Sequence, residues 1–459
     1  MDMLVVQGGR PLSGTVYVDG AKNAALPIMA ACLAIEGSVS LGRVPDLVDV
    51  RTMTLLLSSL GVDVQASGEN SVVIDASSAG SWVAEYDLVR RMRASICVLG
   101  PLLARFGKAR VSLPGGCNIG HRPVDLHLKG LAALGADIQI VNGYIIAECN
   151  RLQGAELSLA GPFGSTVTGT CNVLMAACVA KGRTVIRSAA MEPEVVDLGQ
   201  FLIAAGAEIR GLGTSVIEVD GVDGLHAAEY QIVPDRIEAA TLAIAAAATR
   251  GSVLIPNAPV DDLHQVLEML KAAGVDVDVS CAGLAIQTSK VLTSVDVVAQ
   301  PYPGIPTDCQ AQFMALLTTV KGRSSVRDTV FPDRFMHASE LLRMGATIQR
   351  HSDMAEIEGG TKLTGANVMA SDLRASAALV IAALAADGIS CVRRIYHLDR
   401  GYAKLERKLS TLGAIIDRVS DNEPGRPHYL QHINQQNEMP TGRASPPRSD
   451  GSSSANDHR

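Results

Sequence analysis

The amino-acid sequence predicts an α/β fold built from six copies of one unit of helices and strands. Three observations support this: a glycine motif recurs at nearly regular spacing, long Ala-rich apolar segments accompany it, and only 3% of the residues are aromatic against 47% hydrophobic. Small apolar side chains in such numbers suit helices and sheets that pack closely. With 459 residues the chain is also too long for one ordinary hydrophobic core, so we expect more than one domain.

The repeated motif is a small or apolar residue, then a glycine, then Ala or Val at the start of an alternating strand. Successive motif glycines are 74, 71, 68, 71 and 68 residues apart by subtraction of their numbers. A nearly fixed period of this kind indicates one supersecondary unit that is repeated along the chain. The motif glycines are Gly61, Gly135, Gly206, Gly274, Gly345 and Gly413.

Each unit is expected to contain two helices and two strands. Ala-rich segments such as 24–34, 239–248 and 375–386 are long enough for fully buried helices. A short strand such as 252–255 should follow each of them, and an amphipathic helix such as 262–273 should then lead to the motif glycine and a further strand. A glycine follows several of these helices and is expected to be its C-cap. These glycines are Gly37, Gly182, Gly251, Gly322 and Gly388.

Six copies divide into two groups of three, which predicts a first lobe at 21–232 and a second lobe at 233–420. Strands expected at 4–7 and 15–18 precede the first copy, so we expect residues 1–20 to join the second lobe. Two chain crossings between the lobes would form a hinge, and the cleft between them is where we expect an active site. A purely structural array of repeats is the alternative.

Composition and charge argue against several classes of partner. A formal net charge of -7 and a pI of about 5.8 imply no general attraction to nucleic acid or to an anionic membrane. The sequence lacks both a long apolar run and a signal-peptide pattern, so we expect a cytoplasmic protein.

The nine cysteines of the chain lack CxxC spacing, which argues against a disulfide framework or a metal site. Residues 421–459 are polar and are expected to form a disordered tail. The sequence does not indicate an oligomeric state.

The segment 113–127 surrounds one cysteine with glycines and basic residues. Cys117 lies in this loop, and a glycine-rich loop is flexible with an exposed backbone. Positive charge from Arg122 and from the neighbouring His121 can lower the pKa of the thiol, which would suit it for proton transfer or nucleophilic attack. An unreactive loop cysteine is the alternative.

Charged residues gather where several of the expected buried helices begin. Lys22 and Asn23 start the first of these helices, where free N–H groups and the helix dipole favour an anion. If the helix starts face one cleft, Lys22, Arg93 and Arg374 would surround a small anion with several negative charges. Solvated helix ends are the alternative. Other charged residues at helix starts are Asp235, Arg236, Glu238, Asp308 and Asp372.

Three of the charged residues could take part in catalysis or could have a purely structural role. Asp308 precedes an apolar helix, which is typical of a helix N-cap or of a general base. Arg334 and Arg400 lie in linkers between a strand and the second helix of a unit, and loops carry function more often than cores do. A simple salt bridge is the alternative for either arginine.

Four segments carry a resemblance to a known family. They are Gly20-Ala-Lys-Asn-Ala-Ala-Leu-Pro, Pro-Gly-Gly-Cys-x-Ile-Gly-x-Arg-Pro-Val-Asp-Leu-His, Pro-Thr-Asp-x-Gln-Ala-Gln-Phe and Asp-Arg-Gly-Tyr. With these segments in combination, the chain from Leu4 to Val419 resembles the UDP-N-acetylglucosamine 1-carboxyvinyltransferases, which are enolpyruvyl transferases.

This resemblance implies a fold of two inside-out α/β lobes with three repeats each and an active site in the cleft. It also implies transfer of the enolpyruvyl group of phosphoenolpyruvate to the 3-hydroxyl of UDP-N-acetylglucosamine, through a tetrahedral phospho-ketal that loses phosphate. The reaction is the first committed step of peptidoglycan precursor synthesis, so roles in cell-wall formation, cell shape and cell division would follow. Fosfomycin, which alkylates the cysteine of this family, would be an inhibitor. The resemblance implies no cofactor and no metal.

Roles follow by resemblance where the motifs match. Cys117 would protonate the methylene carbon of phosphoenolpyruvate and Asp308 would accept the proton of the sugar hydroxyl, with Lys22 and Arg400 as further catalytic residues. The residues expected to bind phosphoenolpyruvate are Lys22, Asn23, Arg122, Arg334, Arg374 and Arg400. The residues expected to bind the sugar nucleotide are Asn23, Arg93, Arg122, Pro123, Val124, Asp125, Leu126, Gly164, Asp308 and Val330.

The sequence departs from the family pattern in two places. Asn118 and His121 stand where small residues are expected, and the segment after Gly164 is longer than usual. Because this segment belongs to the nucleotide region, transfer to another uridine nucleotide, as in nucleoside-antibiotic pathways, is the alternative reaction. A non-catalytic protein that binds sugar nucleotides for regulation is an alternative of another class.

Overall fold

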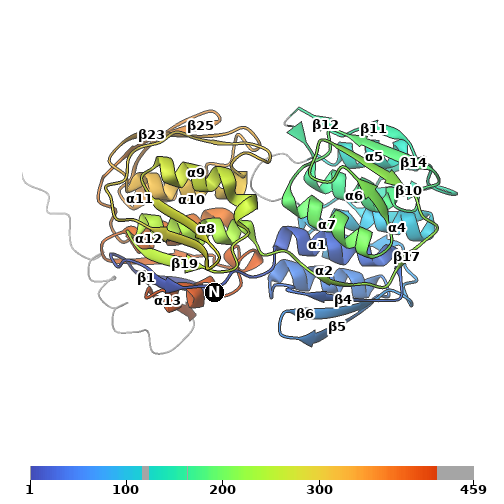
Figure 1. Cartoon of the computed structure of the whole chain (residues 1–459), viewed down its shortest axis with the longest axis horizontal. Helices are drawn as coiled ribbons and strands as arrows, with labels where there is room; N and C mark the ends of the chain where they lie inside the picture. The colour runs from blue at the N-terminus through green and yellow to red at the C-terminus, as the bar shows by residue number, and fades with distance from the viewer. Residues whose placement is uncertain (1, 116–122, 163, 421–459) are drawn as a thin grey trace, which may run out of the picture. The chain divides into compact units, whose positions relative to one another are not determined.

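The computed structural model of the chain describes residues 2–115, 123–162 and 164–420. In this part of the chain, buried hydrophobic side chains form two clusters. The first core cluster runs from Ala21 to Ile232, and the second core cluster combines 4–18 with 237–416. Among the described residues six four-stranded sheets surround the helices of these clusters (Figure 1).

The first core cluster is built around apolar helices that pack against one another. They are α1 (Lys22–Ala31), η2 (Arg93–Val98), α4 (Leu99–Phe106) and α6 (Val167–Ala177). Apart from Asn23, every residue of α1 is buried, so this helix has no solvent-facing side. The other helices of this half are η1 (Cys32–Ala34), α2 (Val48–Ser59), α3 (Tyr86–Val89), α5 (Asp125–Ala133) and α7 (Pro193–Ala204).

The sheets of this half share one strand pattern, in which the first two strands run parallel and the other neighbours antiparallel. In sheet order, their strands are β18 (Glu229–Gln231), β4 (Ser38–Gly42), β6 (Ser71–Asp75) and β5 (Asp63–Gly68); β7 (Val83–Ala84), β8 (Lys108–Ser112), β10 (Tyr144–Glu148) and β9 (Asp137–Val141); and β11 (Glu156–Ser158), β14 (Arg183–Arg187), β16 (Val216–Asp220) and β15 (Glu208–Arg210). Short pairs join β12 (Ala160–Gly161) to β13 (Gly164–Ser165) and β17 (Leu225–His226) to β3 (Ile35–Glu36).

The second core cluster has the same construction. Its central helices α8 (Arg236–Ala248), α10 (Thr307–Thr318) and α12 (Leu373–Ala385) pack pairwise against one another. All residues of α8 and all but Ala385 of α12 are buried, as their Ala-rich sequences predict. The other helices are η3 (Val260–Leu263), α9 (His264–Ala272), α11 (Ala338–Arg343), η4 (Leu398–Arg400) and α13 (Leu405–Thr411).

The N-terminal strands pair with strands of the second core cluster. Leu4 lies opposite Val392 and Ser13 lies opposite Ser252. In sheet order, the strands are β26 (Asn367–Met369), β27 (Ile389–Arg393), β1 (Asp2–Gln7) and β28 (Ile415–Ser420); β2 (Ser13–Thr15), β19 (Ser252–Ile255), β21 (Gly283–Gln287) and β20 (Asp276–Ser280); and β22 (Val297–Ala299), β23 (Gly322–Asp328), β25 (Met354–Gly359) and β24 (Thr347–His351).

Every motif glycine ends the helix before it in the same way. Their φ angles lie between +89° and +101°, a region that strains any residue with a Cβ atom. At Gly135, for example, the backbone N–H donates to the carbonyl of Ala132 at 2.9 Å, and the N–H of Ala136 donates to the carbonyl of Leu131 at 3.2 Å. This is the Schellman arrangement, and it explains why the sequence repeats a glycine followed by a small buried residue.

The glycines expected as C-caps serve another purpose. Gly37, Gly182 and Gly388 directly precede strands, and Gly322 is the first residue of one; all four have positive φ angles. At the end of α8 it is Arg250 that takes the left-handed conformation, with φ 58°. A Cβ atom on Gly251 would lie 2.2 Å from the carbonyl oxygen of Leu12, so this glycine permits close approach of the N-terminal segment.

Two other expected boundaries were wrong. The strand expected at 15–18 is β2, which covers Ser13–Thr15. The helix expected at 262–273 begins as the 3₁₀ helix η3 and becomes α-helical only at His264, because helix ends often tighten into 3₁₀ turns. The expected tail at 421–459 lies outside the described residues.

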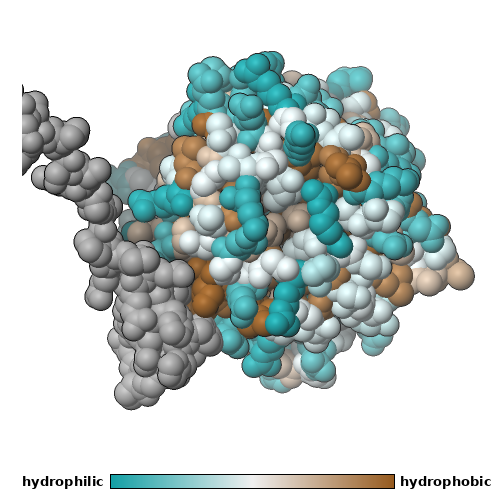
Figure 2. Space-filling model, turned by 90° about the vertical axis from the view of Figure 1, so that its left-hand side faces the viewer, coloured by the Kyte–Doolittle hydropathy of each residue, from teal (hydrophilic) through white to brown (hydrophobic). Residues whose placement is uncertain are grey.

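The chain passes between the two core clusters through two segments that bond to each other. The N–H of Ala21 donates to the carbonyl of Val233 at 2.7 Å, and the N–H of Asp235 donates to the carbonyl of Asp19 at 2.8 Å. The first residues of α1 and α8 therefore lie close together. On the face shown in Figure 2, hydrophilic residues and residues of intermediate hydropathy cover most of the surface, and hydrophobic residues form separate small patches. Among the described residues there is no helix with the length and apolarity needed to cross a membrane.

Candidate active site

Basic side chains that lie far apart in the sequence meet beside carboxylates at the ends of central helices. The residues come from the first turns of α1, α2, α10 and α12, from η4, and from the turn before α11. Both core clusters therefore contribute to one group. These residues, here called the charged cluster, are Lys22, Asp49, Asp308, Arg334, Arg374 and Arg400.

Asp308 binds two arginines with its two oxygens. Arg334 Nη1 donates to Oδ1 at 2.9 Å and Arg374 Nε donates to Oδ2 at 3.1 Å. The arginine side chains are only 5% and 1% exposed, whereas 25% of the Asp308 side chain is exposed. Burial alone would raise the pKa of this carboxyl group, but the charges of Arg374 and Arg334 outweigh it and hold the pKa well below its ordinary value. Asp308 is the second residue of α10 and not its N-cap, which is Pro306.

Asp49 binds the other two cations of the charged cluster. Arg400 donates from Nε to Oδ1 at 2.8 Å and from Nη2 to Oδ2 at 3.3 Å, and Lys22 Nζ lies 3.4 Å from Oδ2. Burial lowers the pKa of the Lys22 ammonium, and the Asp49 carboxylate opposes this shift while Arg374 and Arg400 add to it. The charge of Lys22 thus interacts both with the pair of Asp49 and Arg400 and with the group around Asp308.

Helix caps place these side chains. Asp372 is the N-cap of α12: its Oδ1 accepts from the backbone N–H of Arg374 at 2.9 Å and also lies 3.5 Å from Arg334 Nη2. Asp235 is the N-cap of α8 and accepts from the backbone N–H of Lys22 at 3.2 Å. Each cap satisfies free N–H groups of its own helix and also fixes a neighbouring basic residue.

A buried aspartate shapes the turn that carries Arg334. Asp328 Oδ1 accepts from the backbone N–H groups of Val330 and Phe331 at 2.9 and 2.8 Å. Its other oxygen accepts from the Thr307 hydroxyl at 2.6 Å, next to Asp308. Val330, which was expected to bind the nucleotide, therefore lies beside the charged cluster.

Arg374 has unused hydrogen-bonding capacity. Its guanidinium carbon lies 5.0 Å from the centre of the Tyr402 ring, and the ring position is fixed by a 2.8 Å hydrogen bond between the Tyr402 and Thr241 hydroxyls. Nη1 and Nη2 of Arg374 are buried without a hydrogen-bond partner in the described structure. Buried guanidinium N–H groups need acceptors, and a small carboxylate or phosphate ligand would supply them.

A second group contains most of the expected nucleotide-binding residues. Arg93 Nη2 donates to the carbonyl of Pro123 at 3.1 Å, and Val124 and Asp125 follow directly at the start of α5. Leu126 lies against the β12–β13 hairpin, since a Cβ atom on Gly161 would be 2.9 Å from Leu126 Cδ1. Gly164, in the same hairpin, has a φ angle of 98°, and a Cβ there would lie 3.2 Å from Pro301.

The start of α5 is also fixed by a buried histidine. The amide nitrogen of Asn172 lies 2.8 Å from His127 Nδ1, and the hydroxyl of Thr168 lies 3.1 Å from Nε2. Because the Asn172 oxygen accepts from the N–H of Gly100, its amide nitrogen must be the donor to His127, whose Nδ1 then carries no proton.

The structure brings together only some of the residues that the sequence indicated. Lys22, Asp308, Arg334, Arg374 and Arg400 meet in the charged cluster, and Asn23 is the half-buried neighbour of Lys22 in α1. Arg93 begins a 3₁₀ helix and donates to the carbonyl of Pro123, in the segment expected to bind the nucleotide. Cys117 and Arg122 lie outside the described residues.

Sequence reasoning missed Asp49 and gave Asp372 no role beyond a helix start. Asp49 lies in an unremarkable Leu-Val-Asp-Val segment, and only its contacts show that it binds two cations. A signal for Asp372 existed, because an aspartate two residues before a buried arginine at a helix start is typical of an N-cap.

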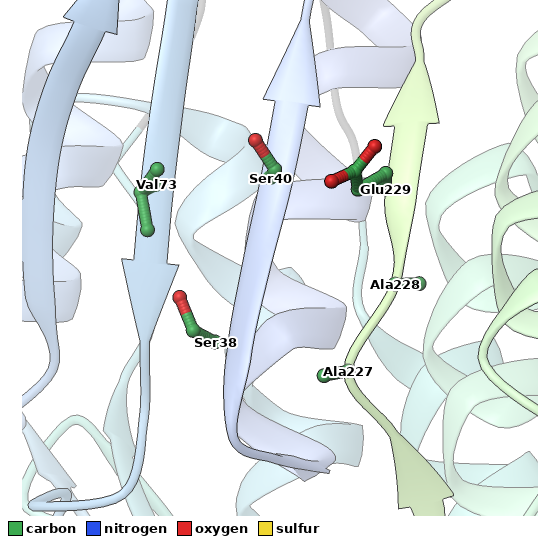
Figure 3. A pocket seen from close by; sticks show the side chains of 6 residues that line it. All are labelled: Ser38, Ser40, Val73, Ala227, Ala228 and Glu229. Atoms are coloured by element: carbon green, nitrogen blue, oxygen red, sulfur yellow. The ribbon is translucent and has the colours of Figure 1, made fainter.

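A shallow pocket lies elsewhere, on the sheet of β18, β4 and β6. Figure 3 shows Glu229 beside Ser40 across the β18–β4 pair, with Ser38 and Val73 around them. None of these residues belongs to the charged cluster. The described residues also contain no group of His, Cys, Asp and Glu that could hold a metal ion.

The chain is similar to proteins of known function. The chain matches the family model of EPSP synthase (3-phosphoshikimate 1-carboxyvinyltransferase) over residues 6–409. A UDP-N-acetylglucosamine 1-carboxyvinyltransferase from Methylacidiphilum infernorum (isolate V4) is 50% identical over 419 residues, which cover 91% of this chain and 99% of the relative. One from Desulfovibrio desulfuricans is 52% identical, again over 91% of this chain and 99% of the relative.

Solved structures show the same fold. The enolpyruvyl transferase NikO from Streptomyces tendae aligns with a TM-score of 0.82 and 26% identity, over 91% of this chain and 99% of NikO. EPSP synthase from Acinetobacter baumannii aligns with a TM-score of 0.70 at 18% identity, over 92% of this chain and all of that structure. The mixed α/β fold is therefore that of the enolpyruvyl transferases. The family model and the relatives show that the chain is an enzyme of this class. Within the class, it belongs to the family of the UDP-N-acetylglucosamine 1-carboxyvinyltransferases, which confirms the resemblance found in the sequence.

Proposed function

We propose that this protein transfers the enolpyruvyl group of phosphoenolpyruvate to the 3-hydroxyl of UDP-N-acetylglucosamine and releases phosphate. The charged cluster carries this proposal, because buried cations with unused donors on Arg374 suit a small substrate with a carboxylate and a phosphate. Relatives about 50% identical over nearly their whole length are named for this acceptor. The reaction begins peptidoglycan precursor synthesis, so the protein serves cell-wall formation, and with it cell shape and division, from the cytoplasm.

In this proposal the two halves of the charged cluster bind the two ends of phosphoenolpyruvate. Arg334 and Arg374 bind the carboxylate, while Lys22 and Arg400, with Arg122, bind the phosphate. Fixed cations in a cleft that excludes water stabilise the charge that develops in the transition state without reorganising. Asn23 supports both substrates from its place beside Lys22.

The chemistry is an addition followed by an elimination. The sugar 3-hydroxyl oxygen bonds to C2 of phosphoenolpyruvate, its proton goes to Asp308, and Cys117 gives a proton to the methylene carbon. The C2–O bond to phosphate then breaks, and a proton leaves the new methyl group to restore the double bond. Arg93, Pro123, Val124, Asp125, Leu126, Gly164 and Val330 hold the sugar nucleotide in this proposal.

The pKa of Asp308 suggests how the base is activated. A carboxylate paired with two arginines holds protons weakly and is a poor base. When the substrate carboxylate shares Arg334 and Arg374, their pull on Asp308 weakens and the pKa of Asp308 rises. Substrate binding thus makes Asp308 a stronger base at the moment the hydroxyl must lose its proton.

The finer architecture belongs to the same proposal. Two inside-out lobes, at 21–232 and 233–420, would hold three repeats each, with residues 1–20 joining the second and the active site in the cleft between them. The division into core clusters at 21–232 and at 4–18 with 237–416 supports these boundaries. So does the position of the charged cluster, which draws residues from both.

A phosphate-release assay with phosphoenolpyruvate and purified protein tests the function. We expect release with UDP-N-acetylglucosamine and none with uridine monophosphate. The longer segment after Gly164, in the expected nucleotide region, keeps another uridine nucleotide as the second candidate acceptor. Turnover of uridine monophosphate without the amino sugar nucleotide would establish it. Binding of a sugar nucleotide without phosphate release from any acceptor would favour a regulatory protein.

A further inference from the structure

Asp49 is the member of the charged cluster that no sequence motif assigned. Its side chain is 3% exposed and contacts cations from both core clusters, Lys22 from α1 and Arg400 from η4. We propose that Asp49 is a positioning residue that holds Lys22 and Arg400 side by side, so that both are oriented toward the phosphate of phosphoenolpyruvate. The inference rests on the proposed function for the identity of the phosphate-bearing substrate.

The geometry fixes the orientation of Arg400. Nε and Nη2, on one edge of the guanidinium, contact the two oxygens of Asp49 at 2.8 and 3.3 Å. Such a fork sets the plane of the guanidinium as well as its position. A single hydrogen bond would leave the group free to rotate.

Lys22 is held by the same carboxylate. Its Nζ lies 3.4 Å from Asp49 Oδ2, the oxygen that also contacts Arg400. An ammonium has three donors, so one contact to Asp49 leaves capacity for a ligand. Without the negative charge between them, Lys22 and Arg400 would repel each other in a site with little water, and their spacing would no longer match a phosphate.

The contrast with Asp308 separates positioning from catalysis. Both carboxylates bind two cations, but 25% of the Asp308 side chain is exposed, whereas 3% of the Asp49 side chain is. Asp308 can reach a substrate hydroxyl, and Asp49 acts only through the cations that cover it. Its loss should therefore affect the phosphate-bearing substrate and spare the sugar nucleotide.

A pH profile reports this role. The charged groups that face the Lys22 ammonium are Asp49, Asp308, Arg374 and Arg400. Asp49 is the largest influence that raises the pKa of Lys22, against the effect of burial. Removing its charge lowers the pKa of Lys22 further, so Lys22 loses its proton, and the site loses its phosphate affinity, at a lower pH.

The first experiment compares Asp49→Asn with Asp46→Asn. Asp46, three residues before Asp49, is 46% exposed and pairs with the exposed Arg51 at 2.6 Å. Its substitution makes the same chemical change without removing a contact to Lys22 or Arg400. In Asp49→Asn we expect KM for phosphoenolpyruvate to rise about 10- to 100-fold, as loss of one charged hydrogen bond predicts. We also expect an unchanged KM for the acceptor and an alkaline limb of kcat/KM displaced to lower pH. Equal KM changes for both substrates, or an unmoved alkaline limb, would overturn the inference.

The second experiment does not depend on turnover. Calorimetric binding of inorganic phosphate should weaken about tenfold in Asp49→Asn relative to wild type and Asp46→Asn. Equal phosphate affinity in all three proteins overturns the positioning role, even if turnover confirms the proposed function. Asp49-dependent phosphate binding in a protein without turnover preserves the role and rejects the function.

Asp49→Glu serves if the asparagine variant does not fold. It keeps the charge and displaces it by one methylene group, so we expect weaker phosphate binding with an unmoved alkaline limb. Wild-type phosphate affinity in this variant would show that the position of the carboxylate is unimportant.

Discussion

Asp308→Asn tests the charged cluster most directly, because it removes one negative charge from between two buried arginines. The asparagine oxygen can accept from either Arg334 or Arg374, and its amide N–H groups then face the other. One charged hydrogen bond is lost and the second is weakened, which at about 1.5–3 kcal/mol for each such bond predicts a loss of about 2–4 kcal/mol. The 25% exposure of Asp308 places the loss toward the lower end.

Thermal unfolding provides the measurement. The unfolding entropy of a chain of this length is about 1 kcal/mol per degree, so Tm should fall by about 2–4 °C for cooperative unfolding. Phosphoenolpyruvate should raise Tm more in the variant than in wild type, because the substrate carboxylate no longer competes with an internal one. Turnover should fall by a factor of about 10² to 10⁴, as expected for loss of a general base.

Asp333→Asn is the matched control, since Asp333 is adjacent to Arg334 in sequence but 82% exposed. Its Tm and turnover should equal those of wild type. The reasoning would be refuted if Asp308→Asn melted at the wild-type temperature and gained no additional stability from phosphoenolpyruvate.

Three further predictions concern the thiol, the repeat and acid stability. Fosfomycin in the presence of UDP-N-acetylglucosamine should add one covalent adduct to wild type, detected by mass spectrometry, and none to Cys117→Ala. This variant should fold normally and turn over poorly. An adduct on the variant would contradict the assignment of Cys117 as the reactive thiol. Gly135→Ala should cost about 1–2 kcal/mol in unfolding free energy, because φ is 92° while nothing lies within 4 Å of the added methyl group; an unchanged denaturation midpoint would show that backbone strain at the cap is negligible. The pKa of Asp308 is lower in the folded than in the unfolded protein. Its ionised side chain therefore contributes to the free energy of unfolding above about pH 4, and this contribution is lost as the pH falls toward the folded pKa. The Tm difference between wild type and Asp308→Asn should shrink on acidification, and a constant difference would exclude this linkage.

The sequence predicted those parts of the fold that depend on local preferences. The apolar Ala-rich segments became buried helices α1, α8 and α12, because no side of them could face water. The motif glycines became Schellman caps, because only glycine adopts their φ angles without strain. Boundaries such as β2 and the start of α9 were misplaced, since hydrogen bonds to neighbouring strands and tightening of helix ends decide them.

Site residues, too, could be predicted only where the local sequence carried a signal. Lys22, Asp308 and Arg374 could be singled out because charge at the start of an apolar helix is conspicuous in a sequence. Asp49 could not, because one aspartate at the start of an ordinary amphipathic helix carries no local sign of the cations that bind it. Its partners are 27 and 351 residues away along the chain.

By itself, the sequence determined the repeated unit and its buried helices, since these depend on residue types at short, regular spacing. It also carried the motifs by which the chain resembles its family, and the reaction was implied by that resemblance. The tertiary structure decided which charges meet. Electrostatic interactions act between groups a few ångströms apart, however distant they are along the chain. Only the packing of α1, α2, α10 and α12 with η4 and the turn before α11 shows that Asp49 and Asp308 each bind a pair of cations.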